Sequence, residues 1–182
     1  MEKENFDSAY NERHAPRHNK TIEFLKRHVN TSEKILDLGV ANNLSKLMID
    51  NGYQVTNTPD GIDLDTSSDQ IKNMECDVMT AFEIFEHLVS PFPLLLKTQA
   101  KKLVASVPLR LWFATAYWNE DDPYDRHYHE FEPRQFDMLL NKAGWVIKDS
   151  EKWVSKPDRI TGVRSFFRHR TPRHYIVYCE RN

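Results

Sequence analysis

The chain has 182 residues, with 25 Lys and Arg against 27 Asp and Glu, which gives a formal net charge of −2. This length is typical of one domain spanning residues 1–182, and the balanced charge argues against a globally basic nucleic-acid binder. The two cysteines form no CxxC pair, which argues against a disulfide scaffold or a Cys-based zinc site. The polar start of the chain and its short apolar runs predict a cytoplasmic protein without a membrane span.

Apolar segments and amphipathic segments alternate through the first hundred residues. Residues 21–29 and 44–49 have apolar side chains at helical spacing, and the second segment ends at Asn51-Gly52, which is typical of a helix C-cap. Further helices are predicted over 83–88 and 92–100. The predicted strands, each a short β-rich or apolar run, are residues 34–39, 53–57, 61–65 and 76–82.

The second half continues the alternation. A strand over 102–107 ends at Pro108, a helix over 135–143 ends at Gly144, and strands follow at 145–147 and 174–178. Strands that alternate with helices predict an α/β fold with a doubly wound, mostly parallel sheet. The last strand is expected to be antiparallel, at or near an edge. Ligands of such sheets bind at the carboxyl ends of the strands.

The residues that follow these strands carry a family resemblance. In chain order they read ILDLGVANN at 35–43, DVMTAFEIFEHL at 77–88, KKLVASVP at 101–108 and HEFEPRQFDMLLNKAGW at 129–145. Their order and spacing resemble class I S-adenosylmethionine (SAM) dependent methyltransferases. The resemblance implies a Rossmann-like methyltransferase fold, SAM as cofactor, and transfer of a methyl group.

By this resemblance, the loop after the first strand lies against the methionine part of SAM. A backbone that passes close to a ligand needs small residues, and Gly39 and Ala41 occupy the first two such positions, with Asn43 at the third. Asn tolerates a left-handed backbone better than most residues do. Asp37 is expected to organise the loop or to reach the methionine ammonium through water.

The second strand departs from the family pattern. The family usually has an acidic residue at its end to hold the ribose, whereas Asn57 stands there in this chain, with Asp60 as an alternative. The resemblance places Asp63 near the adenine amino group and Leu64 against the adenine ring. The remaining predicted cofactor contacts, alongside the bound molecule, are Phe82 and Glu83.

The segment after the predicted strand at 76–82 carries ionisable side chains at helical spacing. Positions i, i+3 and i+4 share a helix face, so Glu83, Glu86 and His87 are expected to converge. His127 or His129, later in the chain, is expected at the opening of the same site. This ExxEH pattern resembles small-RNA 2′-O-methyltransferases and the O-methyltransferases of ubiquinone synthesis, which use a divalent ion. The predicted metal ligands are Glu83, Glu86, His87 and His129. A metal-free general base, His87 or His129, is the alternative, and a metal is not our first expectation.

Two further segments bear on the acceptor. Residues 109–133 are rich in aromatic side chains and are predicted to form a lid over the acceptor site, with an extra helix or a dimer contact as the alternative. The tail 156–182 holds seven Lys and Arg, which suit either an anionic ligand or a solvated edge.

These features together favour a methyltransferase acting on an oxygen or nitrogen of a small or medium-sized acceptor, anionic or sugar-like. Two alternatives remain open: a methyltransferase-like binding module with little turnover, and a metal-dependent RNA 2′-O-methyltransferase. The net charge of −2 argues against nucleic acid as a partner. A Rossmann dehydrogenase is disfavoured because the loop GVANNL lacks the GxGxxG glycines.

Overall fold

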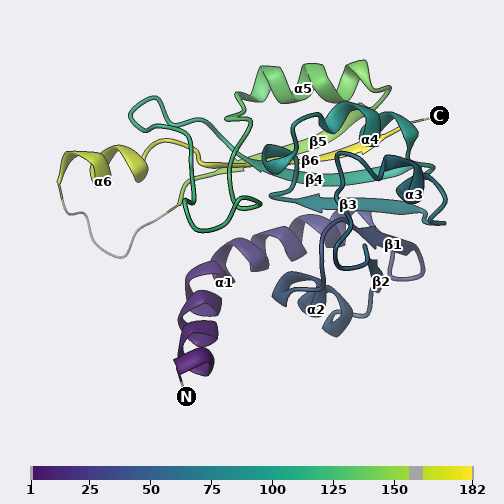
Figure 1. The fold of residues 1–182 in the computed structure, drawn as a ribbon, viewed down its shortest axis with the longest axis horizontal. Helices are drawn as coiled ribbons and strands as arrows, with labels where there is room; N and C mark the ends of the chain where they lie inside the picture. Colours follow the sequence, from purple (N-terminus) through teal and green to yellow (C-terminus); the bar gives the residue numbers. More distant parts are fainter. Residues whose placement is uncertain (1, 156–161, 182) are drawn as a thin grey trace.

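The structure is a computed structural model that describes residues 2–155 and 162–181. Helices and strands alternate along the chain, as the sequence predicts (Figure 1). The helices are α1 (Glu2–His28), α2 (Asn43–Asp50), α3 (Ser68–Lys72), α4 (Pro91–Lys97), α5 (Pro133–Lys142) and α6 (Val163–Arg168), with a 3-10 turn, η1, at Phe85–His87. The strands are β1 (Lys34–Asp37), β2 (Gln54–Asn57), β3 (Val78–Phe82), β4 (Lys102–Pro108), β5 (Val146–Trp153) and β6 (His174–Glu180).

The strands form one sheet in the order β2-β1-β3-β4-β6-β5. Neighbours from β2 to β4 pair in parallel, while β6 pairs antiparallel with both β4 and β5. The antiparallel strand β6 therefore lies next to the edge, as predicted. This is the doubly wound, mostly parallel α/β sheet that the sequence alternation indicates.

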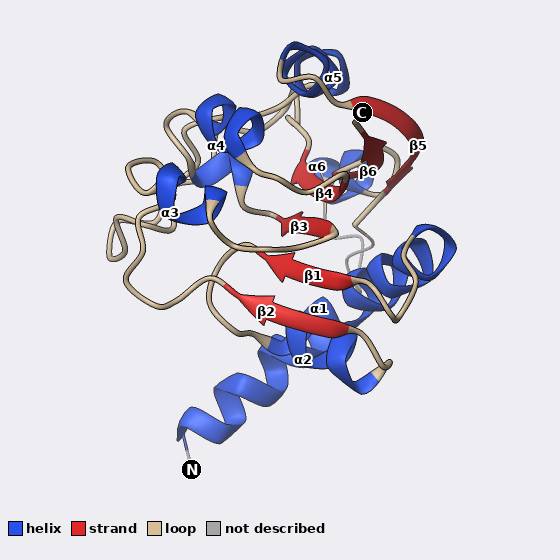
Figure 2. Ribbon diagram, turned by 90° about the vertical axis from the view of Figure 1, so that its right-hand side faces the viewer, coloured by secondary structure: helices blue, strands red, loops and turns tan. Residues whose placement is uncertain are grey.

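Helices cover both faces of this sheet (Figure 2). Alternate residues along each strand point to opposite faces, so β4 gives Leu103, Ala105 and Val107 to one core and Val104 to the other. The first core packs under α3, α4 and α5, and the second packs under α1 and α2. This two-sided burial explains why the central strands read as continuous apolar runs.

The predicted strand at 61–65 is wrong, because this segment forms turns. The Asp63 carboxylate accepts a hydrogen bond from the backbone N–H of Asp65 at 2.9 Å, and the Asp63 carbonyl accepts one from the N–H of Ser67 at 2.8 Å. The Asp65 carboxylate in turn binds the N–H groups of Val89 and Ser90, both at 2.9 Å. Asp side chains that bind nearby backbone groups favour turns over strands. Because residues 61–65 add no strand, β2 is the edge strand of the sheet.

The predicted helix over 83–88 shrinks to the 3-10 turn η1. Glu83, two residues before η1, has a positive φ of 57°, so the helix cannot begin at this residue as predicted. The long segment between β4 and α5 is held by two isolated bridges, Leu109 with Phe131 and Trp118 with Arg126. In the part of the chain that the structure describes, no helix has the length and apolar character of a membrane span.

Candidate active site

The sheet changes winding direction at β1, because β2 lies on one side of it and β3 on the other. In open α/β sheets, ligands bind outside the strands' carboxyl ends at such a point. Gly39 follows β1 with a φ of 98°, a left-handed conformation that glycine adopts without strain. A Cβ at this position would lie 3.2 Å from Cδ1 of Ile84. The loops after β1 and β3 therefore approach each other closely.

Asp37, at the end of β1, is the centre of a buried hydrogen-bond network. Its Oδ1 accepts a bond from the Thr80 hydroxyl at 2.6 Å, and its Oδ2 accepts one from the Asn57 amide at 3.0 Å. The Asn57 amide also donates to the Gly39 carbonyl at 3.3 Å, and the Gly39 N–H donates to the Thr58 hydroxyl at 2.9 Å. Asp37 and Asn57 thus hold the β1 loop in place. Burial raises the pKa of Asp37 to about 6, against the opposing effect of these hydrogen bonds.

Glu83, directly after β3, is tied to residues from three other elements. Its carboxylate lies 3.0 Å from the Arg17 guanidinium of α1 and 3.7 Å from Nδ1 of His174 on β6, and it accepts a bond from the Ser106 hydroxyl at 3.1 Å. Burial acts to raise the pKa of Glu83, but His174, Arg17 and Ser106 outweigh it and lower the pKa to about 2. The strained backbone of Glu83 is fixed by these contacts.

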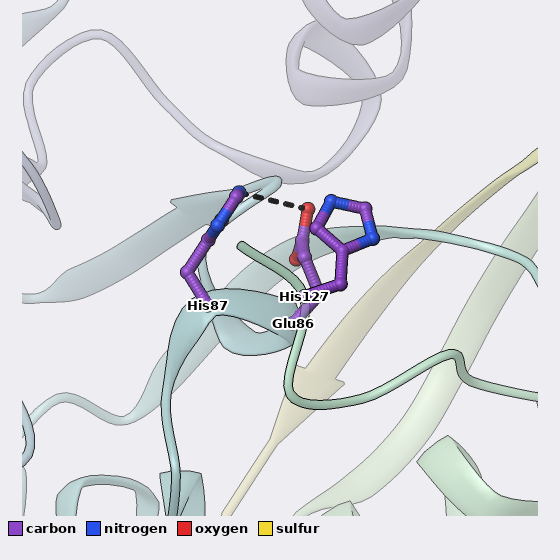
Figure 3. Close-up of side chains that lie close together, drawn as sticks. All are labelled: Glu86, His87 and His127. Carbon is purple, nitrogen blue, oxygen red and sulfur yellow. Dashed lines mark ion pairs between the residues drawn. The ribbon is translucent and has the colours of Figure 1, made fainter. Parts of the chain in front are cut away.

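A cluster of Glu86, His87 and His127 lies beside this group. One ligand atom from each residue lies within 4.8 Å of the others. Nε2 of His87 is 3.8 Å from Oε1 of Glu86, and the His127 ring stands at the other side of the same carboxylate (Figure 3). Glu86 and His87 come from η1, whereas His127 comes from the segment between β4 and α5.

The outer nitrogens of the two imidazoles are engaged with oxygen atoms. Nδ1 of His87 lies 3.1 Å from the carbonyl oxygen of Arg126, and Nδ1 of His127 lies 2.8 Å from the Glu130 carboxylate. A carbonyl oxygen only accepts, and the contact with His127 lowers the pKa of Glu130 despite its burial, so each Nδ1 is the donor. In the neutral ring of His87, Nε2 then carries the lone pair and lies 3.8 Å from Oε1 of Glu86, the arrangement that supports metal-ligating histidines.

The Glu86 side chain is buried with one carboxyl oxygen unpaired among the described residues. The residue is 1% exposed, and the oxygen without a hydrogen-bond partner is Oε2. Burial, followed by the charge of Glu83, raises the pKa of Glu86 well above its usual value. Its backbone carbonyl accepts bonds from the N–H groups of Tyr128 and His129, at 2.8 and 3.2 Å. A divalent cation would satisfy the orphaned oxygen, so the residues fit one chemically.

The structure separates some residues that the sequence groups together. His127 occupies the place in the cluster that the sequence assigns to His129, whose Nε2 lies 3.2 Å from the Val89 carbonyl instead. Glu83 stands next to the cluster but is bound to Arg17, so it is not among the three close ligands. Asn43 does not need the left-handed backbone that Asn tolerates, because it begins α2 and Gly39 supplies the positive φ of this loop.

The other predicted cofactor residues lie around the same sheet edge in varied settings. Ala41 is exposed in the β1 loop, and Asn42 caps α2 by accepting bonds from Leu44 and Ser45. Asp63 is exposed in its turn, while Leu64 packs on the core beneath it. Phe82 ends β3 and is half-buried.

Five contact residues of this site escape a reading of the sequence motifs: Arg17, Thr80, Ser106, Glu130 and His174. Arg17 and His174 lie far from Glu83 along the chain, so no local spacing signals the contact. Thr80 offered a weak signal, because a hydroxyl inside an apolar strand must find a buried partner.

Comparison with known proteins places the fold among SAM-dependent methyltransferases. No family model matches the chain, and no curated protein matches it. Among solved structures, a Burkholderia thailandensis 1,6-didemethyltoxoflavin-N1-methyltransferase with bound 1,6-didemethyltoxoflavin and S-adenosylhomocysteine is similar, with a TM-score of 0.62, 13% identity, and coverage of 91% of this chain and 78% of that chain. A SAM-dependent methyltransferase from Methanosarcina mazei has a TM-score of 0.60 at 10% identity, covering 87% and 96% of the two chains.

A solved structure of a protein with another activity is also similar to this chain. The 4+2 cyclase SpnF has a TM-score of 0.55 and 12% identity, over 90% of this chain and 80% of its own. At these identities the likeness establishes the Rossmann-like methyltransferase fold, and the chemistry has to be argued from the site itself.

Proposed function

We propose that this chain is a SAM-dependent methyltransferase that transfers a methyl group to an oxygen or nitrogen of a small or medium-sized acceptor. One observation carries the proposal: the Gly39 loop at the switch point of the sheet packs against Ile84, in the same segment after β3 that supplies Glu86 and His87 of the cluster. The fold neighbours support it, since one of them holds S-adenosylhomocysteine and a small-molecule acceptor.

The loop after β1 is the proposed seat of the methionine part of SAM. Gly39 gives a close backbone approach, Ala41 adds a small side chain, and Asp37 with Asn57 holds the loop rigid. We place the adenine toward Asp63 and Leu64. Because the Asn57 amide is engaged with Asp37 and Gly39, only its carbonyl oxygen would be available to a ribose hydroxyl.

Methyl transfer from a sulfonium is an in-line displacement, so the enzyme must mainly align the acceptor and accept its proton. Nε2 of His87 or His127 carries the lone pair that can take this proton. Burial, with a contribution from the neighbouring His127, lowers the pKa of His87 and keeps it neutral and ready at pH 7. The segment 109–133, which carries His127, would cover the acceptor as a lid. In this assignment His127 replaces the predicted His129.

The first prediction concerns Gly39. Replacing Gly39 with Leu should abolish SAM binding, because the side chain would enter the gap toward Ile84. Gly144→Leu is the control, since Gly144 has a similar φ of 88°, with nothing within 4 Å of its Cβ direction. Both variants share the backbone strain of about 1–2 kcal/mol.

Isothermal titration with SAM and S-adenosylhomocysteine measures this directly. Wild type and Gly144→Leu should bind both, and folded Gly39→Leu should bind neither. Equal SAM affinity in Gly39→Leu and Gly144→Leu would place the cofactor elsewhere. Binding without methyl transfer to any acceptor tested would favour the binding module.

A metal-dependent version is the second candidate, favoured by the orphaned Oε2 of Glu86. Glu86, His87 and His127 would hold a divalent cation, which lowers the pKa of a bound acceptor hydroxyl. Titration of the protein with Mn²⁺ or Zn²⁺ alone should then show one site. Glu86→Gln keeps the size of the side chain but removes the carboxylate, so it should weaken the site by at least about tenfold. If wild type binds no cation and a chelator leaves activity intact, the metal-free general base is the mechanism.

A further inference from the structure

A cavity of about 270 Å³ opens beside the candidate active site. One wall comes from the segment between β4 and α5, and the other comes from α6 and the turn before β6. The carboxyl end of β3 points toward this side of the molecule, where α6 lies well apart from α5 (Figure 1). Prominent among the lining residues are Tyr117, Trp118, Glu130, Arg164, Arg168 and Arg173.

Among the described residues that line this cavity, positive charges outnumber negative ones. Three of these residues carry guanidinium groups and one, Glu130, carries a carboxylate. That carboxylate is shared between His127 at 2.8 Å and Arg173 at 3.4 Å. Arg164 and Arg168, one helical turn apart on α6, are both exposed and add two positive charges at the opening.

We propose that this cavity binds the anionic group, a phosphate or carboxylate, of a ring-bearing small-molecule methyl acceptor. Arg forks recognise both anions through paired hydrogen bonds. The aromatic walls of Tyr117 and Trp118 suit a flat ring next to the charge. The role of this ligand as a methyl acceptor rests on the proposed function, whereas the binding of the anion does not depend on it.

Two residues that line the cavity, Tyr117 and Glu130, also contact His127 of the cluster, which links anion binding to the chemistry. Glu130 contacts both His127 and Arg173. The Tyr117 ring centroid lies 5.1 Å from that of His127, and the Tyr117 carbonyl accepts a bond from the His127 N–H at 3.1 Å. An anion held by the arginines would therefore leave the rest of a small molecule next to His127, where its proton is accepted.

The size of the cavity favours a small ligand. Its volume of about 270 Å³ is near the lower end of the range of roughly 300–1,000 Å³ for small-molecule sites. This volume suits one ring with one charged substituent. A nucleic acid would instead need a positive surface that extends along a backbone, whereas the chain carries a net charge of −2.

Phenyl phosphate, benzoate and neutral phenol are the probes for an NMR titration of the full chain. Phenyl phosphate or benzoate should bind to the wild type at least about tenfold more tightly than phenol. The double variant Arg164→Gln/Arg168→Gln should lose about tenfold or more of this affinity, since each charged hydrogen bond contributes strongly. Arg134→Gln/Lys142→Gln on α5 removes the same two charges from exposed positions elsewhere, and should leave it unchanged.

The outcomes separate this inference from the proposed function. SAM titrated into the α6 double variant should bind as it does to the wild type. If SAM binds but the anionic probes bind no better than phenol, or if the two double variants lose affinity equally, the anion site is overturned and the methyltransferase proposal stands. If the probes behave as expected and SAM fails to bind, the anion site stands and the methyltransferase proposal falls.

Discussion

Asp37 shows how one buried carboxyl group organises the loop after β1. It is 3% exposed, and its two carboxylate oxygens receive bonds from Thr80 and Asn57. Desolvation penalises the charged form more than these two bonds stabilise it, so its pKa rises from 3.8 to about 6. The folded state therefore binds this proton more tightly than the unfolded chain. A loop held by a costly charge is typical of a site built for ligand binding.

The pH dependence of stability tests this residue. Because the folded pKa is raised, the contribution of Asp37 is fully present below about pH 4 and is lost as pH rises through about 6. Asp37→Asn cannot titrate at this position. From pH 4 to 7, the free energy of unfolding of the wild type should therefore fall by about 2–3 kcal/mol relative to that of the variant. Urea denaturation across this range measures the difference. A constant difference would show that Asp37 has an ordinary pKa.

At the scale of elements, the ion pair of Arg17 with Glu83 joins α1 to the end of β3. Both side chains are largely buried, with exposures of 23% and 16%. The pair of Arg27 with Glu151 attaches the same helix to β5, but those side chains are 47% and 41% exposed. The helix thus offers one screened and one partly desolvated ion pair for comparison.

Arg17→Gln and Arg27→Gln form a matched test of this difference. We expect Arg17→Gln to cost about 1.5–3 kcal/mol in unfolding free energy, because Glu83 loses a charged partner in a buried place. Arg27→Gln should cost about 0–1 kcal/mol, since water screens the exposed pair. Loss of Arg17 also raises the folded-state pKa of Glu83 toward its unfolded value of 4.5, so the extra cost of Arg17→Gln should shrink as pH falls from about 4.5 toward 2. Equal costs would mean that the Arg17–Glu83 pair stabilises the fold no more than the exposed Arg27–Glu151 pair does.

Sequence patterns predicted the elements with strong apolar periodicity and failed where side chains bind backbone locally. The central strands and α5 follow from burial on both faces of the sheet, which leaves a plain apolar signal. The predicted strand at 61–65 had the same signal in Ile62 and Leu64, but Asp63 and Asp65 drew the backbone into turns.

The candidate site was predicted in outline, because strand ends are positions that order along the chain can locate. The set of side chains that come together in the Glu86–His87–His127 cluster was not predicted. The choice between His127 and His129 depends on how the segment 109–133 folds back, where Tyr128 and His129 both donate to the Glu86 carbonyl. The Arg17 contact with Glu83 likewise arises from tertiary packing alone.

At the scale of the whole molecule, the two cores are built on the same strands. Residues 175, 177 and 179 of β6 enter the core under α3, α4 and α5, while Ile176 and Tyr178 enter the core under α1 and α2. A strand that loses its packing in one core therefore also loses its packing in the other. The sheet should therefore unfold as one cooperative unit, even though its two faces have no side chains in common.

Two matched cavities, one in each core, test this cooperativity. Ile71 on α3 belongs to the first core and Ile176 on β6 to the second, and both are 0% exposed. Each Ile→Val change should cost about 0.5–1.5 kcal/mol. The double variant should lose the sum to within about 0.5 kcal/mol, because the two sites share no packing partners across the sheet. Fluorescence and circular dichroism should report one coincident urea transition in all four proteins. Two separated transitions, with each variant shifting only one of them, would show that the layers unfold independently.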